Sequence, residues 1–381
     1  MSELSYLEKL LDGVEVEWRN LGDTSLFEIA NNGRKPVKAS LRIAGETPYY
    51  GANNIQDYVD GYTHDGEYVL IAEDGSASLE NYSIQYATGK FWANNHVHVV
   101  RGKERVHSRF LYHYLCIVNF LPFLTGGGRA KLTKGQLIEI PVPIPCPDNP
   151  EKSLAIQSEI VRILDKFTAL TAELTAELTM RKKQYNYYRD QLLSFKEGEV
   201  EWKTLGEVAV IGTGNHDTQD AIEHGKYIFY ARGREPLKLN VFDFDETAII
   251  TAGDGAGVGK VFHYAKGKYA LHQRAYRIVP NAFMNPRFVY HYITAYFFTY
   301  IQKASVSSSV TSLRRPMFLK FPIPVPPSEE QARIVEILDK FDTLTNSITE
   351  GLPREIELRQ KQYEYYRDLL FSFPKPETVS N

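Results

Sequence analysis

Several features that would assign this chain to a common class are scarce or missing. It has only two cysteines in 381 residues, Cys116 and Cys146, and they lack metal-ligand spacing. No run of about 18 uninterrupted apolar residues could span a membrane. Met1–Gly13 is acidic and amphipathic, whereas a signal peptide is basic and then apolar. The sequence therefore predicts no membrane segment, and a reducing, cytoplasmic location is expected.

Motifs for catalysis are also missing. Gly253–Lys260 fails the P-loop pattern, because that pattern needs glycine where Asp254 stands and serine or threonine where Val261 stands. The methyltransferase phrase N-P-P-Y is absent, and the NPRF of Asn285–Phe288 does not replace it. The ten histidines contain no H-x-x-x-H pair with an acid nearby. No catalytic residue, bound cofactor or metal is therefore predicted on this chain.

The sequence does contain one segment written twice. ILDKF occurs in Ile160–Phe195 and again in Ile334–Phe373, and RKKQYNYYRD in the first copy corresponds to RQKQYEYYRD in the second. In the first copy apolar and aromatic residues recur at alternating steps of four and three, which is typical of a helix that packs along a partner helix. The chain is therefore predicted to be an internal repeat with two long paired helices, the second broken at Pro353.

Each helix follows a segment that reads as mostly β. Glu17–Pro150 and Glu199–Pro327 alternate runs of Val, Ile, Tyr and Phe with polar turns, and the first includes a predicted helix near Ser108–Asn119. Both end in a proline-rich phrase, IPVPIP or FPIPVP. We expect these phrases to be hinges, because proline cannot continue a sheet ladder or a helix. The predicted parts are a β-rich domain at 1–150, a long helix at 151–197, a β-rich domain at 198–327, a long helix at 328–375 and a tail at 376–381.

The two ends of the chain read as neighbours. Met1–Gly13 resembles the last turns of a helix and is comparable with the stretch that ends at Gly198. Each is followed by a matching phrase, VEVEWRNLG or VEWKTLG, so the N-terminus resumes the motif that the second helix drops at Phe373. The predicted fold class is α+β: two β-rich domains joined by two long helices, with an internal two-fold repeat and a circular organisation.

The ordered set of these phrases, present twice, resembles the specificity subunit of Type I restriction-modification enzymes over essentially the whole chain. This resemblance rests on the proline-rich phrases, on the helix starts SEEQARIVEILDKFDTLT and AIQSEIVRILDKFTALT, and on the helix ending RxKQYxYYRDxLLxF. The first copy departs from the pattern, because it lacks Glu-Glu before Gln157. The resemblance implies a non-catalytic subunit in which each β-rich domain is a target-recognition domain for half of a split sequence in double-stranded DNA. The antiparallel helices would form a coiled-coil rod that sets the gap between the halves.

The resemblance also implies partners. Two methyltransferase subunits would dock on the helix pair, and motor-nuclease subunits would join them for restriction. S-adenosylmethionine, ATP and Mg²⁺ would be bound by those partner subunits. Packing of the helix tyrosines against the chain's own domains is an open alternative to docking. The candidate docking residues are Tyr185, Tyr188, Tyr363 and Tyr366.

The distribution of charge supports a DNA partner, although the net charge of −3 does not. Residues 258–320 contain ten Lys or Arg and no Asp or Glu, and residues 81–138 contain eight against the single acid Glu104. A basic stretch at equivalent positions of both repeats is the pattern expected of a nucleic-acid-binding protein.

Candidate DNA contacts lie in and near these basic stretches. Asn and Gln side chains can pair with adenine and Arg with guanine, which singles out Asn94–His96 and the equivalent His272–Arg274. Basic residues in small-residue loops are candidates for phosphate contact. The predicted DNA-binding residues are Lys90, Trp92, Asn94, Asn95, His96, Arg129, Lys131, Lys134, Tyr230, Arg232, Arg234, Lys260, His272, Gln273, Arg274, Ser308, Arg314 and Arg315.

Two other classes of function stay open. A dumbbell adaptor could carry two peptide- or glycan-binding β domains on a coiled-coil rod, but the paired basic stretches disfavour it. A methyltransferase or nuclease in its own right is disfavoured by the missing motifs. Steep salt dependence of DNA binding would exclude the adaptor, and a cofactor-binding titration on the lone chain would reveal an enzyme.

Overall fold

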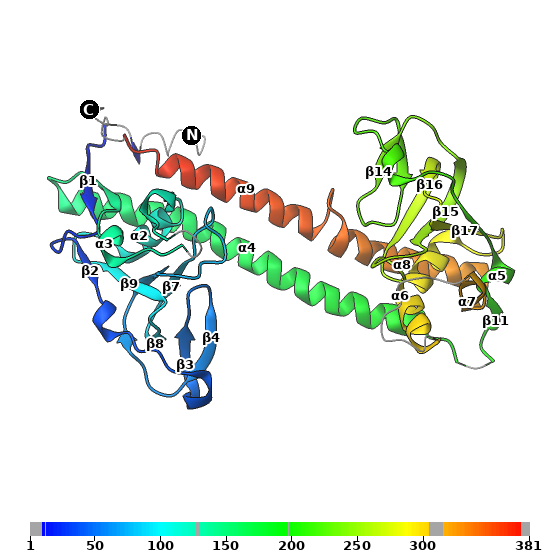
Figure 1. Cartoon of the computed structure of the whole chain (residues 1–381), viewed down its shortest axis with the longest axis horizontal. Coiled ribbons are helices and arrows are strands. Elements are labelled where there is room, and N and C mark those ends of the chain that lie inside the picture. The colour runs from blue at the N-terminus through cyan, green and yellow to red at the C-terminus, as the bar shows by residue number, and fades with distance from the viewer. Residues whose placement is uncertain (1–9, 12, 127–129, 197, 305–314, 375–381) are drawn as a thin grey trace. The chain divides into compact units, whose positions relative to one another are not determined.

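The computed structural model describes residues 10–11, 13–126, 130–196, 198–304 and 315–374 (Figure 1). The chain divides into two compact units. The first unit combines residues 1–173 with residues 356–381, and the second unit consists of residues 174–355. The helices α4 (Pro150–Leu192) and α9 (Leu352–Leu370) contribute residues to both units.

The first unit places its strands in small sheets. A two-stranded sheet pairs β1 (Val16–Asn20) with β10 (Pro141–Pro145). One four-stranded sheet has the order β2 (Phe27–Ile29), β9 (Val97–Gly102), β6 (Tyr68–Ala72), β7 (Ile84–Ala87). The other has the order β4 (Ile55–Val59), β3 (Ala44–Tyr50), β8 (Lys90–Ala93), β5 (His64–Asp65). Its short helices are α2 (Ser108–Leu115) and α3 (Lys134–Leu137), with 3-10 turns at Asn31–Gly33, Ala39–Leu41 and Leu121–Phe123.

The second unit repeats this plan around one larger sheet. A two-stranded sheet pairs β11 (Glu201–Thr204) with β18 (Pro322–Val325). The six-stranded sheet has the order β12 (Ala209–Thr213), β17 (Ala275–Pro280), β15 (Phe244–Ala252), β16 (Phe262–Leu271), β13 (Tyr227–Tyr230), β14 (Leu237–Leu239). Its helices are α5 (Leu205–Val208), α6 (Pro286–Ala304), α7 (Arg315–Leu319) and α8 (Ser328–Asn346), with a 3-10 turn at Thr218–Asp220.

The two units use the same strand pairings. The antiparallel pair β6–β9 corresponds to β15–β17, and the parallel pair β3–β8 corresponds to β13–β16. The long strand β16 occupies the sequence that β7 and β8 cover as separate strands in the first unit. The predicted α+β fold with an internal repeat is confirmed.

The proline-rich phrases are strands, so the prediction that they act as hinges was wrong. In β10 the prolines stand at every second position, while Val142 and Ile144 alternate with them and are buried. The N–H groups of successive residues point to opposite edges of a strand. The N–H groups that these prolines lack would therefore all have faced the same edge. The other edge can still pair, and β1 lies there with Arg19 opposite Val142 and Glu17 opposite Ile144.

The circular organisation is visible in the core of the first unit. Leu370, Phe371 and Phe373 follow or end α9 and are buried in this core, against which Leu10 and Leu11 also pack. The indole Nε1 of Trp18 donates a hydrogen bond to the carbonyl oxygen of Pro374 at 2.8 Å. The two ends of the described chain therefore close onto one another, as the repeated phrases predicted.

The helices pair within each unit, and the second one is interrupted. In the first unit the C-terminal part of α9 runs beside the N-terminal part of α4, and both supply residues to the core (Figure 1). In the second unit Tyr185 of α4 lies against Phe341 of α8. Helix α8 ends at Asn346 and α9 starts at Leu352, with Pro353 in its first turn. Gly351 has a φ of +83°, and an added Cβ would stand 2.3 Å from the carbonyl oxygen of Thr343, so this break requires glycine.

Candidate nucleic-acid interface

Two turns occupy equivalent places in the two units, and we call them the matched turns. Asn94–His96 joins β8 to β9, and His272–Arg274 joins β16 to β17. Their first residues are buried. Oδ1 of Asn94 accepts a hydrogen bond from the backbone N–H of His96 at 2.8 Å, and Nδ1 of His272 accepts one from the N–H of Arg274 at 2.9 Å. Asn94 and His272 thus shape the turns, which corrects their prediction as DNA contacts, because a buried side chain cannot meet a base edge.

The second residue of each matched turn is exposed. Asn95 lies at the surface of the first unit. Gln273 is also exposed, and its Nε2 donates a hydrogen bond to Oδ2 of Asp217 at 2.9 Å. Both amides are therefore accessible to a ligand that approaches the turns.

The third residue of each matched turn meets a carboxylate. Nδ1 of His96 lies 2.5 Å from Oδ1 of Asp74, and Nη1 of Arg274 lies 3.0 Å from Oδ2 of Asp254. Burial alone would raise the pKa of Asp254, but hydrogen bonds from Arg232 and Arg274 outweigh it and lower that pKa. Asp254 is therefore ionised at neutral pH and holds two guanidinium groups.

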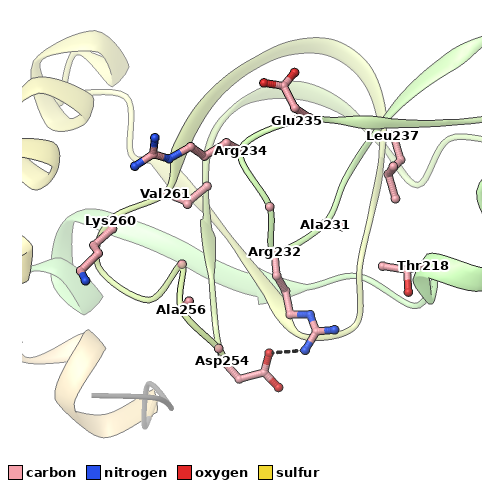
Figure 2. Close-up of a pocket in the computed structure, with 13 residues that line it drawn as sticks. Thr218, Ala231, Arg232, Arg234, Glu235, Leu237, Asp254, Ala256, Lys260 and Val261 are labelled. Carbon is pink, nitrogen blue, oxygen red and sulfur yellow. Dashed lines mark hydrogen bonds and ion pairs between the residues drawn. The ribbon is translucent and has the colours of Figure 1, made fainter. Parts of the chain in front are cut away.

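A hollow of about 720 Å³ opens in the second unit beside this carboxylate (Figure 2). Nη1 of Arg232 donates to Oδ1 of Asp254 at 2.8 Å, and the exposed side chains of Arg234 and Lys260 also line the hollow, together with Glu235. The Gly-rich stretch forms the loop between β15 and β16 and does not open a helix. The loop thus differs from a nucleotide-binding P-loop and contributes to a mainly basic surface.

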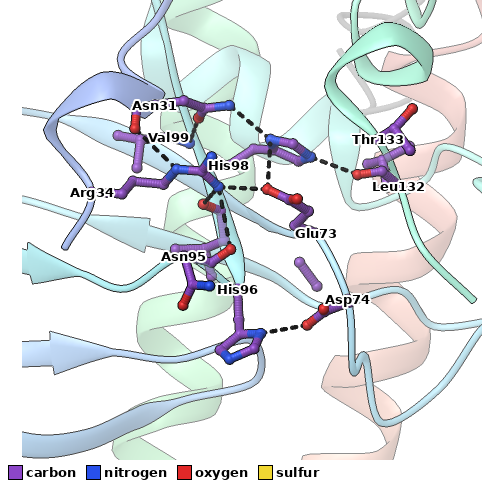
Figure 3. Close-up of polar contacts among 12 residues, drawn as sticks. Asn31, Arg34, Glu73, Asp74, Asn95, His96, His98, Val99, Leu132 and Thr133 are labelled. Atoms are coloured by element: carbon purple, nitrogen blue, oxygen red, sulfur yellow. Dashed lines mark hydrogen bonds and ion pairs between the residues drawn. The ribbon is translucent and has the colours of Figure 1, made fainter. Parts of the chain in front are cut away.

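The first unit fixes its basic loop by a polar network around Glu73 (Figure 3). Nη1 of Arg34 donates to Oε2 of Glu73 at 2.6 Å, and Nζ of Lys131 lies 3.0 Å from Oε1. The backbone N–H of Leu132 donates to the carbonyl oxygen of Glu73 at 2.8 Å, and Nε2 of the buried His98 donates to that of Leu132 at 2.7 Å. Burial acts to raise the pKa of Glu73, but the two cations lower it overall. Lys131 is therefore held beside Asp74, which contacts His96 of the first matched turn, and the Lys131 side chain is exposed.

Of the two aromatic candidates, one is buried and the other is half-buried. Tyr230 is buried, with its ring edge-on to Tyr269 at a centroid distance of 5.8 Å. It is a core residue, which corrects its prediction as a DNA contact. Nε1 of Trp92 donates to the carbonyl oxygen of Lys35 at 2.7 Å, and its half-buried ring stacks on Tyr49.

Other predicted residues lie at the surface or outside the described residues. Lys90 and Lys134 are exposed, and the exposed Arg315 donates from Nη2 to the carbonyl oxygen of Ile211 at 3.2 Å. The predicted contacts outside the described residues are Arg129, Ser308 and Arg314.

Some arginines of the two basic stretches, residues 81–138 and 258–320, have a structural role. Arg101 pairs with Glu28 at 2.6 Å, and Arg277 pairs with Glu246 at 2.8 Å. These arginines stabilise the sheets through cross-strand or neighbouring acids, so counting charge along the sequence overestimated the basic surface.

The residues that fix each domain to its helix were missed as a set by sequence reasoning. Oδ1 of Asp165, in the first ILDKF phrase, contacts Nε of Arg109 at 2.9 Å and Nε2 of His113 at 2.8 Å. Oδ1 of Asp339, in the second ILDKF phrase, contacts Nε of Arg287 at 2.6 Å and the buried His291 at 2.7 Å. The signal was available, because the RFLYHYL and RFVYHYI phrases repeat together with ILDKF.

A glutamine on each long helix adds a second link. Oε1 of Gln157 accepts from the N–H of His107 at 2.8 Å, just before α2. Oε1 of Gln331 accepts from the N–H of Asn285 at 2.7 Å, just before α6. Both glutamines are buried. A buried amide without such partners would cost free energy, so these bonds fix the start of α2 or α6 on the long helix.

The helix tyrosines of the second unit divide between the seam and the surface. Tyr185 and Tyr188 face Phe341, with ring centroids 6.2 and 5.6 Å apart, although Tyr188 leaves 46% of its surface exposed. Burial raises the pKa of Tyr185 to about 12. Tyr187 instead leaves 62% of its surface exposed.

The first unit shows the same division. Tyr366 stacks on Phe167 at 5.2 Å, and the hydroxyl of Tyr363 lies 3.5 Å from Nδ1 of His113. Tyr365 is 55% exposed. The predicted docking tyrosines therefore contribute largely to the packing of the chain itself, and the more exposed pair is Tyr187 and Tyr365.

Metal-binding clusters and membrane-spanning helices are both lacking among the described residues. In that part of the chain, no three His, Cys, Asp or Glu side chains are grouped to hold a metal ion. No helix there is long and apolar enough to cross a membrane.

The fold and the interface define a class of protein. Two copies of a β-rich domain are each fixed to the long helices by the same Arg–Asp–His contacts, and each presents an exposed polar turn beside basic loops. The sequence matches the family described as the Type I restriction modification DNA specificity domain over residues 14–180 and 197–358. The chain belongs to this family. Membership supports a role in DNA sequence recognition and does not favour the peptide- or glycan-binding adaptor.

Relatives of similar length support this assignment. The chain is 46% identical to a type I restriction enzyme specificity subunit of Haemophilus influenzae, covering 97% of the chain and 98% of the relative. It is 42% identical to the EcoR124I/EcoR124II specificity subunit of Escherichia coli over the full length of both.

Solved structures share the fold at low sequence identity. The S subunit of a Type I restriction-modification system from M. genitalium superposes with a TM-score of 0.68 at 16% identity, covering 96% of this chain and 98% of that one. A chain from a study of complex assembly in the type I R-M system gives a TM-score of 0.53 at 13% identity, with 93% and 97% coverage. Both solved chains therefore share the fold of this chain.

Proposed function

We propose that this chain is the non-catalytic DNA-reading subunit of a Type I restriction-modification complex, and that each β-rich domain reads one half of a bipartite target. The observation that carries the proposal is the contrast at the matched turns. Identical positions of the repeat present His96 in one domain and Arg274 in the other, each beside an acid and basic loops. Side chains of different hydrogen-bonding capacity at equivalent places would specify two different half-sites.

The long helices have two further roles in this proposal. They set the unspecified gap between the half-sites, because a helix advances about 1.5 Å per residue and its length fixes where each domain meets the DNA. They also dock two methyltransferase subunits, for which the exposed Tyr187 and Tyr365 are repeat-equivalent contacts. Motor-nuclease subunits join the same complex.

The chemistry of modification and cleavage belongs to the partners in this proposal. S-adenosylmethionine, ATP and Mg²⁺ are bound by the methyltransferase and motor-nuclease subunits. The residues around the Gly-rich loop of the second unit do not fit a nucleotide phosphate site of the P-loop type, since the loop runs between two strands. Its basic side chains are better suited to the phosphates of DNA.

A methylation map tests the proposal. The chain is expressed with its methyltransferase subunit in a host without DNA methylation, and modified bases are located by sequencing the genomic DNA. We expect a split motif with two different specified halves and a fixed gap. Deleting Thr171–Leu174 from α4 should shorten the gap and leave both halves unchanged. A contiguous motif, or a stable complex that methylates nothing, would overturn the proposal.

A further inference from the structure

An acid stands behind each matched turn, and both acids follow equivalent strands. Asp74 lies just after β6, and Asp254 lies just after β15. Each reaches across to the third residue of the turn, Asp74 to Nδ1 of His96 at 2.5 Å and Asp254 to Nη1 of Arg274 at 3.0 Å. The same contact between an acid and the third turn residue therefore occurs in both units, with His96 in the first and Arg274 in the second.

The acid of each pair is recessed and the base is at the surface. Asp254 keeps 24% of its side-chain surface exposed, whereas Arg274 keeps 63%. The values are 22% for Asp74 and 42% for His96. A flexible side chain held from behind by a carboxylate has fewer conformations to lose when it meets a ligand from outside.

Each of these acids also contacts a second basic residue outside its matched turn. The second oxygen of Asp254 accepts a hydrogen bond from Arg232, which lines the basic hollow (Figure 2). Asp74 forms a backbone bridge with Lys131 of the basic loop, next to the Glu73 network (Figure 3). In both units the acid therefore connects a candidate phosphate-binding element with the matched turn.

We propose that Asp74 and Asp254 are positioning residues for sequence readout, each holding the basic side chain of its matched turn against a base edge. Arg274 contacts a guanine in the half-site of the second unit, where Arg can bond O6 and N7 together. His96 donates its Nδ1–H to Asp74 and presents Nε2 to a hydrogen-bond donor on a base of the other half-site. This inference rests on the proposed function and adds the residues that set base choice in each half.

The positioning role of Asp254 predicts that the variant Asp254→Asn has a higher affinity for unrelated DNA and a lower discrimination between bases. Removing a negative charge from a DNA-facing surface raises the affinity for DNA of unrelated sequence. Releasing Arg274 lowers discrimination at one position of the second half-site, by about tenfold for a lost oriented contact. A purely structural acid would instead lower methylation at every site without changing the motif.

The test uses the complex of the chain with its methyltransferase subunit. Methylation maps and competition binding with unrelated DNA are recorded for D254N, D74N, D254E and the control D245N, which removes the charge of an exposed acid on β15. We expect D254N to relax one base of the second half only, D74N one base of the first half only, and D245N neither. D254E should restore part of the discrimination.

A surface variant keeps the inference testable if D254N does not fold. Arg274→Gln alters an exposed side chain and should relax the same base of the second half. An unchanged motif for R274Q would overturn the inference, as would relaxation of both halves by either acid variant. A wild-type motif that is not bipartite would instead overturn the proposed function itself, so the two failures are distinguishable.

Discussion

In the first unit Asp165 binds Arg109 and His113, and in the second unit Asp339 binds Arg287 and His291 at nearly the same distances. The matched turns, which also occupy equivalent places, carry different residues at every position. The two units therefore share the contacts that fix the domain to its helix, although their exposed turns differ. A framework of this kind allows two half-sites to differ without any change in how the domains are held.

The frame, meaning the contacts of Asp165 or Asp339 that fix each domain to its helix, has an extra acid in the second unit, so removing the shared aspartate should have unequal effects in the two units. Arg287 contacts Asp342 at 2.8 Å in addition to Asp339, whereas Thr168 stands at the position equivalent to Asp342 in the first unit. Replacing Asp165 by alanine should therefore lower the free energy of unfolding of the first unit by about 2 kcal/mol, because it leaves a partly buried cation without its acid.

The equivalent Asp339→Ala should cost about half as much, roughly 1 kcal/mol, since Asp342 still pairs with Arg287. Urea unfolding, with hydrogen exchange to report each unit separately, measures both losses. The control is Glu336→Ala, which removes an exposed ion pair with Lys340. Equal losses in the two units would contradict the assigned role of Asp342.

The exposed tyrosines test whether the two helix surfaces dock partners equally. Tyr187→Ala and Tyr365→Ala should each weaken binding of one methyltransferase subunit by about tenfold, as expected for a buried aromatic contact. Native mass spectrometry should then show complexes with one methyltransferase subunit in place of two. Tyr187→Phe keeps the ring and serves as the matched control. Two methyltransferase subunits on both alanine variants would exclude this docking site.

A pH effect should appear in the first unit. Burial lowers the pKa of His113 to about 4, and the hydrogen bond with Asp165 only partly opposes this. The unfolded histidine takes up a proton near its ordinary pKa of about 6.5, while the folded one stays neutral. Stability is therefore fully present above pH 6.5 and falls as the pH drops towards 4, by at most about 1.4 kcal/mol per pH unit.

Unfolding of the first unit at pH 7, 6 and 5 measures this slope in the wild type and in His113→Gln. The variant should show a smaller slope. Some slope should remain, because burial also lowers the pKa of His98 in the same unit. An unchanged slope would show that His113 does not contribute to it.

The smallest predicted effect comes from exchanging the one differing frame residue. Thr168→Asp should give Arg109 a second carboxylate and stabilise the first unit by about 0.5 kcal/mol, the scale of a partly exposed ion pair. Asp342→Thr should destabilise the second unit by a similar amount. Thermal unfolding of the two variants measures both shifts, and shifts of the same sign would contradict the comparison.

Much of the architecture could be predicted from repetition. The paired ILDKF and YYRD phrases indicated two long helices, and the phrase before Gly22 indicated that the chain ends meet. The proline-rich strands were not recognised as strands, because proline lacks the N–H that donates in a strand ladder. The missing N–H groups matter for each edge of a strand separately, and prolines at every second position leave one edge able to pair.

The candidate interface was predictable in place but not in detail. The basic stretches located the matched turns, yet burial removed Asn94, His272 and Tyr230 from the accessible surface. A polar residue that shapes a turn and one that reads a base have the same appearance in sequence. The acids Asp74 and Asp254 were passed over, because a carboxylate near DNA reads as unfavourable until its basic partner is seen.

We propose that each unit carries its own half of the specificity on a common frame. The most direct test is a chain in which residues 199–327 are replaced by a second copy of residues 14–150. Methylation mapping of this chain with its methyltransferase subunit should give a motif of two identical, inverted copies of the first half-site. A motif that retains the original second half would contradict the account.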